Sequence, residues 1–274
     1  MIKLLSEDTI QKIAAGEVIE RPVSVIKELV ENSIDAGSDT IVVEIKNGGK
    51  DFISVSDNGS GIEKNEIELA FKRHSTSKLE KFDDLYNIST LGFRGEALAS
   101  ILAVSKLSVS TRTKSEKIGK KVEFRNSKVI SESDVAMNVG TKIIIKDLFY
   151  NVPVRKKFMK SDQTEANLIT TTMYKFAICN TEVSIKYIKD NKTLFETKKN
   201  SSIRENIINL FGTSMSNNLI DIDINSRDYK IHGYISNNNL YRANRQMQYI
   251  FLNGIFVKCE DIRNTVESNY KSVI

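Results

Sequence analysis

Apolar residues recur at helical spacing early in the chain, in residues 22–36. The stripe that they form consists of Ile26, Leu29, Val30 and Ile34. Pro22 suits the first turn of a helix, where no N–H is needed, and Gly37 suits the position just past its end, where φ is positive. The pattern predicts an amphipathic helix that buries its aliphatic stripe against the rest of the domain.

Alternation of apolar and polar residues marks the strands. Strands are predicted at 41–45, 52–56, 106–112, 119–125, 128–134, 142–147, 183–187 and 193–197. Asn47-Gly48-Gly49 and Asp190-Asn191 are turn sequences, so each joins its flanking strands into an antiparallel hairpin. Helices are predicted at 9–19 (interrupted at Gly16), 63–71, 97–104 and 162–179, the last with an apolar side of Leu168, Ile169, Met173, Phe176 and Ala177.

The composition turns polar at Lys198-Lys199-Asn200-Ser201, which predicts a domain boundary near residue 200. Ser202 and Glu205 form a capping box for a helix that Gly212 ends. Strands at 219–224, 228–236, 247–252 and 255–258 and a helix from about residue 260 follow. Together these elements predict an α+β fold, with helices on one face of a mixed, mostly antiparallel sheet, followed by a smaller α/β domain.

Composition narrows the class of protein without indicating a chemistry. The 274 residues are 40% apolar and 27% charged, as in soluble globular proteins, and the net charge of +5 is compatible with a nucleic-acid contact. Cys179 and Cys259 have no metal-ligand spacing and are expected to be reduced thiols that fill the core. The start of the chain turns acidic too soon for a signal peptide, and the longest apolar run, Ala97–Val104, is too short to span a bilayer. A cytoplasmic protein without a membrane partner is therefore expected.

The polar face of the first amphipathic helix carries Glu28, Asn32 and Asp35 at i, i+4 and i+7. Their oxygens are ligands that Mg²⁺ accepts, and a glutamate can take a proton from an attacking water. The solvated face of an ordinary amphipathic helix has the same composition and stays open as the alternative.

The strand at 52–56 runs into Asp57-Asn58-Gly59-Ser60-Gly61-Ile62. Asp57 could accept a hydrogen bond from an exocyclic amino group such as that of adenine, and the glycines let backbone approach a flat ligand closely. The alternative is a turn that needs Asp-Asn-Gly for its geometry alone.

A long polar segment extends from Arg73 to about Leu91, and long loops tend to be lids or binding loops. It ends in Gly92-Phe93-Arg94-Gly95-Glu96-Ala97-Leu98 at the start of an apolar helix, where N–H groups and the helix dipole favour phosphate. Lys78 and Arg94 are possible charge partners, and Thr141 could offer a hydroxyl to the first pocket residues. Because the sequence has no G-x-x-x-x-G-K-[ST] motif, any nucleotide must be held in another way.

In this order along one chain, the motifs resemble those of the N-terminal ATPase region of MutL-type DNA mismatch repair proteins. The resemblance rests on residues 13–18, 21–22, 27–37, 57–62, 73–78, 91–98, 140–141 and 148–153. It places the chain in the GHKL superfamily, with gyrase B subunits, sensor histidine kinases and large ATP-dependent heat-shock chaperones. It implies a GHKL (Bergerat) α/β sandwich over residues 1–200, with an N-terminal arm at 1–19 and an ATP lid at about 73–95. Residues 201–274 would form a transducer-like, ribosomal-S5-like α/β domain that is incomplete at its C-terminus.

The resemblance also implies residue roles. Glu28 would be the general base that activates water, and Asn32 would hold the Mg²⁺ that bridges the phosphates. Asp57 would read the adenine amino group, with Gly61 close to the ring and Thr141 at the same end. The residues expected around ATP are Asn32, Asp35, Asp57, Gly61, Thr76, Ser77, Lys78, Gly92, Phe93, Arg94, Gly95, Glu96, Ala97, Leu98 and Thr141.

As a mechanism, the resemblance implies a slow, Mg²⁺-dependent ATPase that works as a nucleotide-gated, dimerising clamp. The expected partners are a second copy of the chain, DNA bound weakly and without sequence preference, a mismatch-recognition protein of the MutS type, and a downstream nuclease or helicase. The alternatives are a non-catalytic, nucleotide-gated DNA-binding scaffold and a topoisomerase-type ATPase module.

Two features set this chain apart from the family pattern. The family's second domain supplies a lysine from a His-Pro-x-Lys stretch that does not occur up to residue 274, so ATP binding is expected to survive better than hydrolysis. Ile255 follows Asn253-Gly254 where the family often has arginine.

A basic segment consists of Arg155-Lys156-Lys157 with Lys160. It could contact DNA phosphates or form a solvated basic face.

Overall fold

The computed structural model describes residues 6–76 and 95–271. The chain divides into two compact units. Unit 1 comprises the residues up to Met173 together with Val183–Lys199, and unit 2 comprises Tyr174–Glu182 and Asn200–Ile274. The long helix α6 (Asp162–Cys179) therefore contributes to both units.

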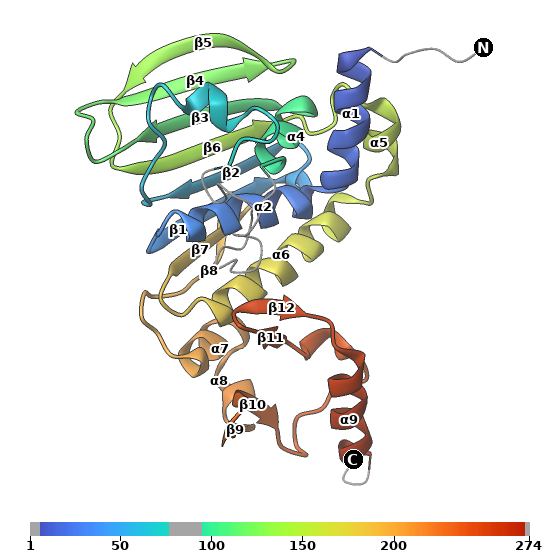
Figure 1. Ribbon diagram of the computed structural model, residues 1–274. Helices are drawn as coiled ribbons and strands as arrows, with labels where there is room; N and C mark the ends of the chain where they lie inside the picture. The colour runs from blue at the N-terminus through green and yellow to red at the C-terminus, as the bar shows by residue number, and fades with distance from the viewer. Residues whose placement is uncertain (1–5, 77–94, 272–274) are drawn as a thin grey trace. The chain divides into compact units, whose positions relative to one another are not determined.

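Unit 1 contains an eight-stranded sheet and most of the helices (Figure 1). Its strands are β1 (Thr40–Lys46), β2 (Phe52–Asp57), β3 (Lys106–Arg112), β4 (Gly119–Arg125), β5 (Lys128–Val135), β6 (Gly140–Lys146), β7 (Ser184–Lys189) and β8 (Lys192–Glu196). Its helices are α1 (Glu7–Val18), α2 (Pro22–Asp35), α3 (Ile67–Ala70), α4 (Ala97–Ala103), α5 (Pro153–Phe158) and the first part of α6, and a 3₁₀ turn, η1, spans Asn47–Gly49.

The strand order of the sheet is β5-β4-β3-β6-β2-β1-β7-β8. β1 and β7 run parallel, and every other pair of neighbours runs antiparallel. The predicted fold class, α+β with a mixed and mostly antiparallel sheet, is confirmed. The two hairpins predicted at the Asn-Gly-Gly and Asp-Asn turns are the β1–β2 and β7–β8 pairs.

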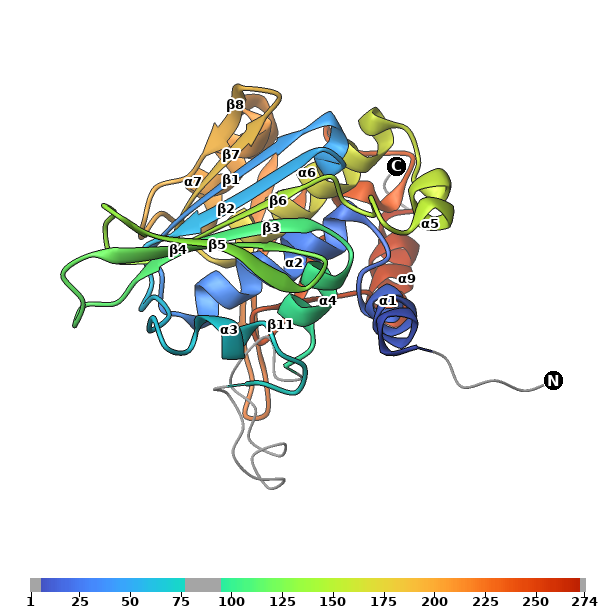
Figure 2. The same cartoon turned by 90° about the horizontal axis from the view of Figure 1, so that it is seen from above.

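Alternate residues of the central strands form the core of unit 1 because successive side chains of a strand point to opposite faces. The buried members are Ile41, Val43, Ile45, Ile53, Val55, Leu107, Val109, Ile143, Ile145, Ile185 and Tyr187. Helices α2, α4 and α6 lie over this face of the sheet (Figure 2). Thr170 of α6, for example, places its hydroxyl 3.3 Å from that of Tyr187.

Two helix predictions need correction. The first helix is not interrupted at Gly16: α1 runs from Glu7 to Val18 and is capped by the Ser6 side chain. Gly16 is needed inside this helix because a Cβ there would lie 1.4 Å from the Arg155 guanidinium. On α6, Leu168 is 36% exposed, and Ala166 is buried together with the predicted Ile169, Met173 and Ala177.

Unit 2 contains two separate two-stranded sheets and short helices. Its elements are α7 (Ile203–Phe211), α8 (Thr213–Ser216), β9 (Leu219–Asn225), β10 (Lys230–Ser236), the 3₁₀ turn η3 (Arg245–Met247), β11 (Ile250–Leu252), β12 (Ile255–Val257) and α9 (Glu260–Tyr270). The predicted capping box at Ser202 and Glu205 is present, and Gly212 ends α7. β11 is shorter than predicted because η3, capped by the Asn244 side chain, occupies the start of that stretch.

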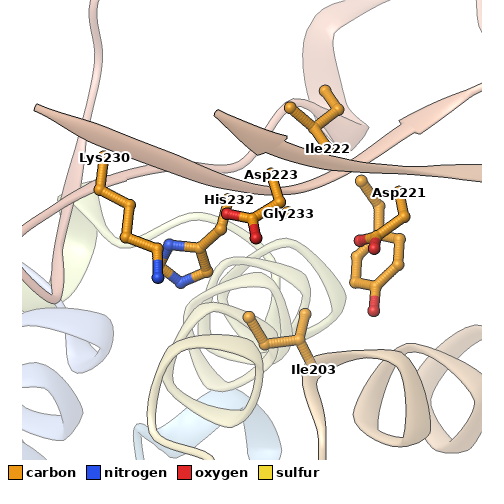
Figure 3. Close-up of a pocket in the computed structure, with 8 residues that line it drawn as sticks. Ile203, Asp221, Ile222, Asp223, Lys230, His232 and Gly233 are labelled. Atoms are coloured by element: carbon orange, nitrogen blue, oxygen red, sulfur yellow. The ribbon is translucent and has the colours of Figure 1, made fainter. Parts of the chain in front are cut away.

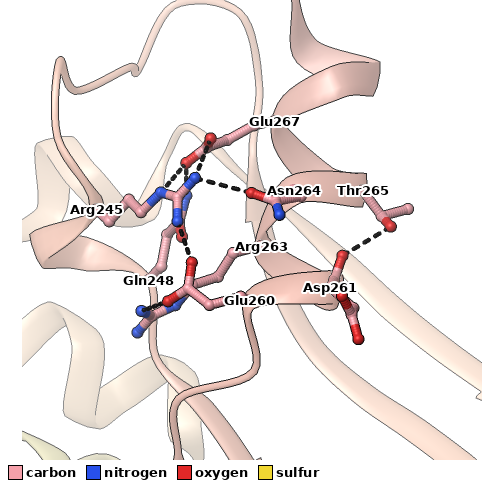
Figure 4. Close-up of polar contacts among 8 residues, drawn as sticks. All are labelled: Arg245, Gln248, Glu260, Asp261, Arg263, Asn264, Thr265 and Glu267. Atoms are coloured by element: carbon pink, nitrogen blue, oxygen red, sulfur yellow. Dashed lines mark hydrogen bonds and ion pairs between the residues drawn. The ribbon is translucent and has the colours of Figure 1, made fainter.

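A polar network joins α9 to the loop before β11 (Figure 4). The Arg245 guanidinium donates to both carboxylate oxygens of Glu267 at 2.6 and 2.8 Å, to Asn264 at 2.9 Å and to Glu260. Glu260 also accepts from Arg263 at 3.2 Å, and Arg263 is 9% exposed. One arginine thus fixes the position of α9 through several side chains at once.

Both cysteines are free thiols, as predicted, but they are half-buried and do not fill the core. Burial raises the pKa of the Cys179 thiol, which donates to the Gly254 carbonyl oxygen at 3.0 Å. Within the described ranges, none of the helices combines the length and the apolar character that crossing a membrane requires.

Candidate nucleotide-binding site

The α2 helix presents Glu28, Asn32 and Asp35 from half-buried positions. The Glu28 side chain is 28% exposed, and its Oε1 lies 3.9 Å from the Lys27 ammonium. Lys27 also lies 3.5 Å from Glu31, one turn further along the helix. These oxygens form a partly sheltered face in which the proposed base keeps contact with solvent.

A serine takes the buried place that the apolar stripe assigns to Ile34. Ser33 is 4% exposed, whereas Ile34 is half-buried. The Ser33 hydroxyl lies 3.0 Å from the Leu29 carbonyl oxygen and 2.9 Å from Asp57 Oδ2. This hydroxyl links α2, one residue after Asn32, directly to the end of β2.

Asp57 ends β2, and its carboxylate is oriented from several sides. Its Oδ1 accepts hydrogen bonds from the backbone N–H of Gly59 at 2.9 Å and of Thr141 at 3.3 Å, and its Oδ2 lies beside Ser33. Burial raises the pKa of Asp57, and the hydrogen bonds from Gly59, Ser33 and Thr141 partly oppose that rise. Because a carboxylate has more lone pairs than these donors use, the group can accept a further hydrogen bond from a ligand.

The turn after Asp57 is held close to β3 and β6. Gly61 has φ +77°, and a Cβ on it would lie 2.3 Å from the Arg112 carbonyl oxygen. The Thr111 hydroxyl accepts from the Ile62 N–H at 2.8 Å and lies 3.1 Å from the Thr141 hydroxyl. Thr111 is not among the predicted site residues, although a hydroxyl residue at a core-facing position of β3, after Leu107 and Val109, indicates a polar role.

The described ends of the lid meet each other. His74 Nδ1 lies 3.7 Å from Glu96 Oε1, and Gly95 has φ +65° with its Cα so close to Ser75 that a Cβ would lie 2.7 Å from the Ser75 carbonyl oxygen. Thr76 follows directly, and Ala97 and Leu98 begin α4. Ser77, Lys78, Gly92, Phe93 and Arg94 lie outside the described residues.

The structure therefore joins the predicted residues in two groups. Asp57 and Thr141 meet at adjacent strands, with Ser33 of α2 against them. Glu96 and the glycine before it meet the first residues of the lid. Helix α2, which carries Glu28, Asn32 and Asp35, packs against both β2 and α4.

One titratable residue of this region was not singled out by sequence. Burial raises the pKa of Glu31 to about 7, with Lys27 lowering it and Glu28 raising it. Its side chain is 12% exposed. The sequence indicates Glu31 as a further acid of α2, three residues after Glu28 and one turn before Asp35.

The donor set of α2 suits a cation that is bound together with phosphates. In residues 6–76 and 95–271, no group of three or more His, Cys, Asp or Glu side chains is placed to hold a metal ion alone. A nucleotide-bound Mg²⁺ needs fewer protein ligands, because it keeps waters and takes phosphate oxygens. The Asn32 amide, with a carboxylate about one turn away on each side, fits that requirement.

A cavity of about 330 Å³ lies in unit 2, between α7 and the β9–β10 hairpin (Figure 3). It is lined by Ile203, Asp221, Ile222, Asp223, Lys230, His232, Gly233 and Tyr234. Asp223 and His232 are cross-strand partners, and the acids and bases nearly balance. Such a lining has little preference for a polyphosphate, so the candidate nucleotide site remains in unit 1.

Comparison with known families identifies the class of the chain. Residues 20–150 match the family described as histidine kinase-, DNA gyrase B- and HSP90-like ATPase, and residues 207–274 match the family described as DNA mismatch repair protein, C-terminal domain. The first match spans α2, the Asp57 turn and β6. The fold and site thus define a GHKL ATPase domain.

Individual relatives define the family within this class more closely. The DNA mismatch repair protein MutL of Agathobacter rectalis is 44% identical over 273 residues, which are 100% of this chain and 42% of that protein. MutL of Caldanaerobacter subterraneus is 43% identical over 273 residues, 46% of its length, so the chain spans less than half of these relatives.

Comparison with solved structures supports the same family. The crystal structure of the N-terminal domain of a DNA repair protein matches with a TM-score of 0.82 and 31% identity, covering 96% of this chain and 82% of that one. The Aquifex aeolicus MutL ATPase domain complexed with ADP matches with a TM-score of 0.71 and 29% identity, covering 92% and 88%. The chain belongs to the MutL family of DNA mismatch repair proteins and corresponds to its N-terminal ATPase region. This membership argues against the topoisomerase-type alternative.

Proposed function

We propose that this chain binds ATP and Mg²⁺ between α2, the Asp57–Ile62 turn, β6 and the lid, and that it hydrolyses the nucleotide slowly. The observation that best supports this proposal is the Asp57 carboxylate, which is held by Ser33, the Gly59 N–H and the Thr141 N–H and still has lone pairs to offer. A buried acid with that many donors is a specific acceptor for an amino group such as that of adenine.

Binding begins with the base. Asp57 accepts from the adenine amino group, and the close packing of Gly61 against Arg112 keeps the turn out of the space of the ring. Because a neutral carboxyl presents one acceptor fewer and a raised pKa brings protonation closer to neutrality, ATP affinity falls as the pH is lowered toward the pKa of Asp57. The backbone N–H groups around Gly95–Leu98 would meet the phosphates at the start of α4.

Hydrolysis needs a base and a charge stabiliser. In the proposal, Glu28 removes a proton from the attacking water, and its 28% exposure leaves room for that water. Bound Mg²⁺, held by Asn32, would neutralise phosphate charge. Asp35, on the same helix face, would hydrogen-bond waters of the site.

The proposal for the whole protein follows the family. Nucleotide binding would order the lid and the N-terminal residues, two copies of the chain would close as a clamp, and hydrolysis would reopen it. The clamp would act in the cytoplasm on weakly held DNA, between a mismatch-recognition protein of the MutS type and a downstream nuclease or helicase. The ADP complex of the Aquifex aeolicus relative supports the nucleotide part of this proposal.

The test separates binding from turnover. Titration of a fluorescent ATP analogue with Mg²⁺ should give similar affinities for wild type and Glu28→Ala, while phosphate release by Glu28→Ala falls by about 10²- to 10⁴-fold. Asp57→Ala and Asn32→Ala should lose binding, and Asp57→Asn should also lose it because its amide turns an N–H toward the adenine amino group.

The matched control is Asp134→Ala, which removes an exposed aspartate of β5 whose nearest basic partner, Lys64, is 3.9 Å away. It should bind ATP as wild type does. Circular dichroism confirms that each variant is folded. Equal ATP affinity in wild type and Asp57→Ala would contradict the assignment of the site.

A further inference from the structure

A network of side chains surrounds Asn58, the residue that follows Asp57. The pairing of β1 with β2 ends at Ile41 and Asp57. Beyond that pair, Asn58 Oδ1 accepts hydrogen bonds from the backbone N–H groups of Asp39 and Thr40, both at 3.0 Å. The Asn58 side chain thus ties the turn after β2 to the start of β1.

The Asp39 carboxylate sets the orientation of the Asn58 amide. Asn58 Nδ2 donates to Asp39 Oδ1 at 2.7 Å. If the amide were turned over, its NH₂ group would face two N–H donors, and its oxygen would face a carboxylate. Only the observed orientation satisfies all of these groups, because an amide has donors at one end and an acceptor at the other.

Asp39 is itself held as an anion. Lys199 Nζ donates to its Oδ2 at 2.6 Å, and the Thr40 hydroxyl donates to its Oδ1 at 3.1 Å. Hydrogen bonds from Lys199, Asn58 and Thr40 lower the pKa of Asp39 to about 2. The backbone carbonyl of Asp39 also accepts from the Ser184 N–H of β7 at 2.8 Å. The carboxylate therefore stays ionised at neutral pH and is anchored to the sheet.

The other side of the turn is tied to the residues after α2. The Ser60 N–H donates to the Ala36 carbonyl oxygen at 3.0 Å, and a Cβ on Gly59 would lie 2.9 Å from the same oxygen. Gly59 lies between Asn58 and Ser60, and its N–H is the group that donates to Asp57 Oδ1 at 2.9 Å. Ties on both sides of Gly59 thus fix the direction of this N–H.

We propose that Asp39 is a positioning residue for the selection of adenine nucleotides. Acting through Asn58, it keeps the Gly59 N–H on Asp57 and so keeps the remaining lone pairs of that carboxylate directed at the amino group of the base. This role rests on the proposed ATP site and concerns the choice of base, and it leaves the chemistry to Glu28.

The alternative is an ion pair that has no role in binding. The Lys199 and Asp39 side chains are 51% and 42% exposed, and exposed pairs of this kind contribute little to stability. Such a pair does not require the second carboxylate oxygen to orient a neighbouring amide. Here that oxygen makes the bond that sets Asn58, the residue next to Asp57.

The experiment compares two nucleotides by calorimetric titration with Mg²⁺. One is ATP, and the other is purine riboside triphosphate, which lacks the amino group of adenine. Wild type should prefer ATP, because only ATP donates to Asp57. Asp39→Ala should weaken ATP binding by about 3- to 10-fold, which is the contribution of about one hydrogen bond, and should leave the affinity for purine riboside triphosphate unchanged. An equal loss for both nucleotides would indicate general damage to the pocket and would overturn the proposal.

A second pair of variants tests the route through Asn58. Asn58→Asp places a second carboxylate against that of Asp39 and should also reduce the preference for ATP. Asp39→Asn/Asn58→Asp exchanges the two groups, so that an amide at position 39 donates to a carboxylate at position 58, which can still accept from both backbone N–H groups. The exchange should restore the preference. If the double variant is as impaired as Asn58→Asp alone, the proposal is wrong.

The matched control is Glu132→Ala. Glu132 of β5 is 42% exposed and lies 2.6 Å from Lys120, as Asp39 is 42% exposed and lies 2.6 Å from Lys199. This variant should keep the wild-type affinity for both nucleotides. If wild type itself shows no preference for ATP, the assignment of Asp57 fails and the role of Asp39 fails with it. If wild type prefers ATP and Asp39→Ala keeps that preference, only the role of Asp39 fails.

Discussion

Different kinds of interaction stabilise the interior of unit 1 and the interior of unit 2. The sheet of unit 1 buries a continuous layer of aliphatic side chains, many of them fully, from Ile41 to Ile185. In unit 2, the hairpin residues Ile220, Ile224 and Ile231 are each about half exposed, and defined side-chain contacts carry much of the order. In unit 1 the loss of apolar surface from water dominates, whereas unit 2 depends on caps and ion pairs.

This difference has a functional meaning. The candidate nucleotide site takes Asp57 and Thr141 from neighbouring strands whose inner faces are buried, so its geometry is set by the packed sheet. A region that depends on exposed polar contacts opens at lower cost and can change its arrangement more easily.

A core substitution should affect unit 1 far more than a hairpin substitution affects unit 2. Ile53 is fully buried on a central strand, so Ile53→Ala should lower the free energy of unfolding by about 2–5 kcal/mol. Ile224 is 50% exposed, and Ile224→Ala should change it by about 0.5 kcal/mol or less. Urea unfolding followed by circular dichroism measures the free energy of unfolding of both variants. Equal losses in the two variants would contradict the difference between unit 1 and unit 2.

The second prediction concerns a buried charge in unit 1. The pKa of Glu31 is raised to about 7, so the folded state disfavours the ionised form, and wild-type stability falls as the pH rises from about 4.5 to 7. Glu31→Gln removes this cost and should be more stable than wild type by about 2–3 kcal/mol at pH 8. Below pH 4.5 the difference should vanish.

The measurement is the pH dependence of thermal unfolding without nucleotide. Lys27 lowers the pKa of Glu31. The substitution Lys27→Met should therefore increase the pH dependence of stability in the wild-type background and leave it unchanged in the Glu31→Gln background. A pH-independent difference between wild type and Glu31→Gln would show that packing, and not ionisation, is responsible.

Periodicity predicted most of the fold correctly because strands such as β1 and β3 alternate between buried and more exposed residues, and because the β1–β2 and β7–β8 turns contain Asn-Gly or Asp-Asn. Periodicity did not reveal contacts between residues that are distant in the sequence. Gly16 looked like a helix break, but the helix continues through it, and the guanidinium of Arg155, far away in the sequence, occupies the space that a side chain would need. No local pattern contains that information.

The candidate site shows the same limit. Its motif residues could be located by sequence, but the contact between Ser33 and Asp57 and the support of Ile62 by Thr111 could not, because they join elements by distances that only the fold sets. The pKa of Glu31 likewise depends on burial by neighbours. The residues of the lid outside the described ranges stay predictions.

The third prediction tests the Gly16 contact. In Gly16→Ala the new methyl group would overlap the Arg155 guanidinium, which now donates to the Ile19 carbonyl oxygen at 3.2 Å. Alanine is otherwise the better helix former by about 1 kcal/mol. A net loss of about 1–2 kcal/mol is therefore expected from the lost hydrogen bond and displaced side chain. Arg155→Ala should reverse the sign of the Gly16→Ala effect, and additive losses would contradict the contact.

The smallest effect is expected at the cap of α7 in unit 2. The Ser202 hydroxyl accepts from the Glu205 N–H at 3.2 Å, while the Glu205 carboxylate accepts from the Ser202 N–H at 2.7 Å. Ser202→Ala should cost about 1 kcal/mol, and Ser202→Asp should retain most of the stability because its carboxylate can accept the same bond. Hydrogen exchange should place the loss in α7 and leave the central strands of unit 1 protected as in wild type. If the strands of unit 1 lose protection to the same degree, the two units unfold together, and the difference in how they are stabilised does not make them separate folding units.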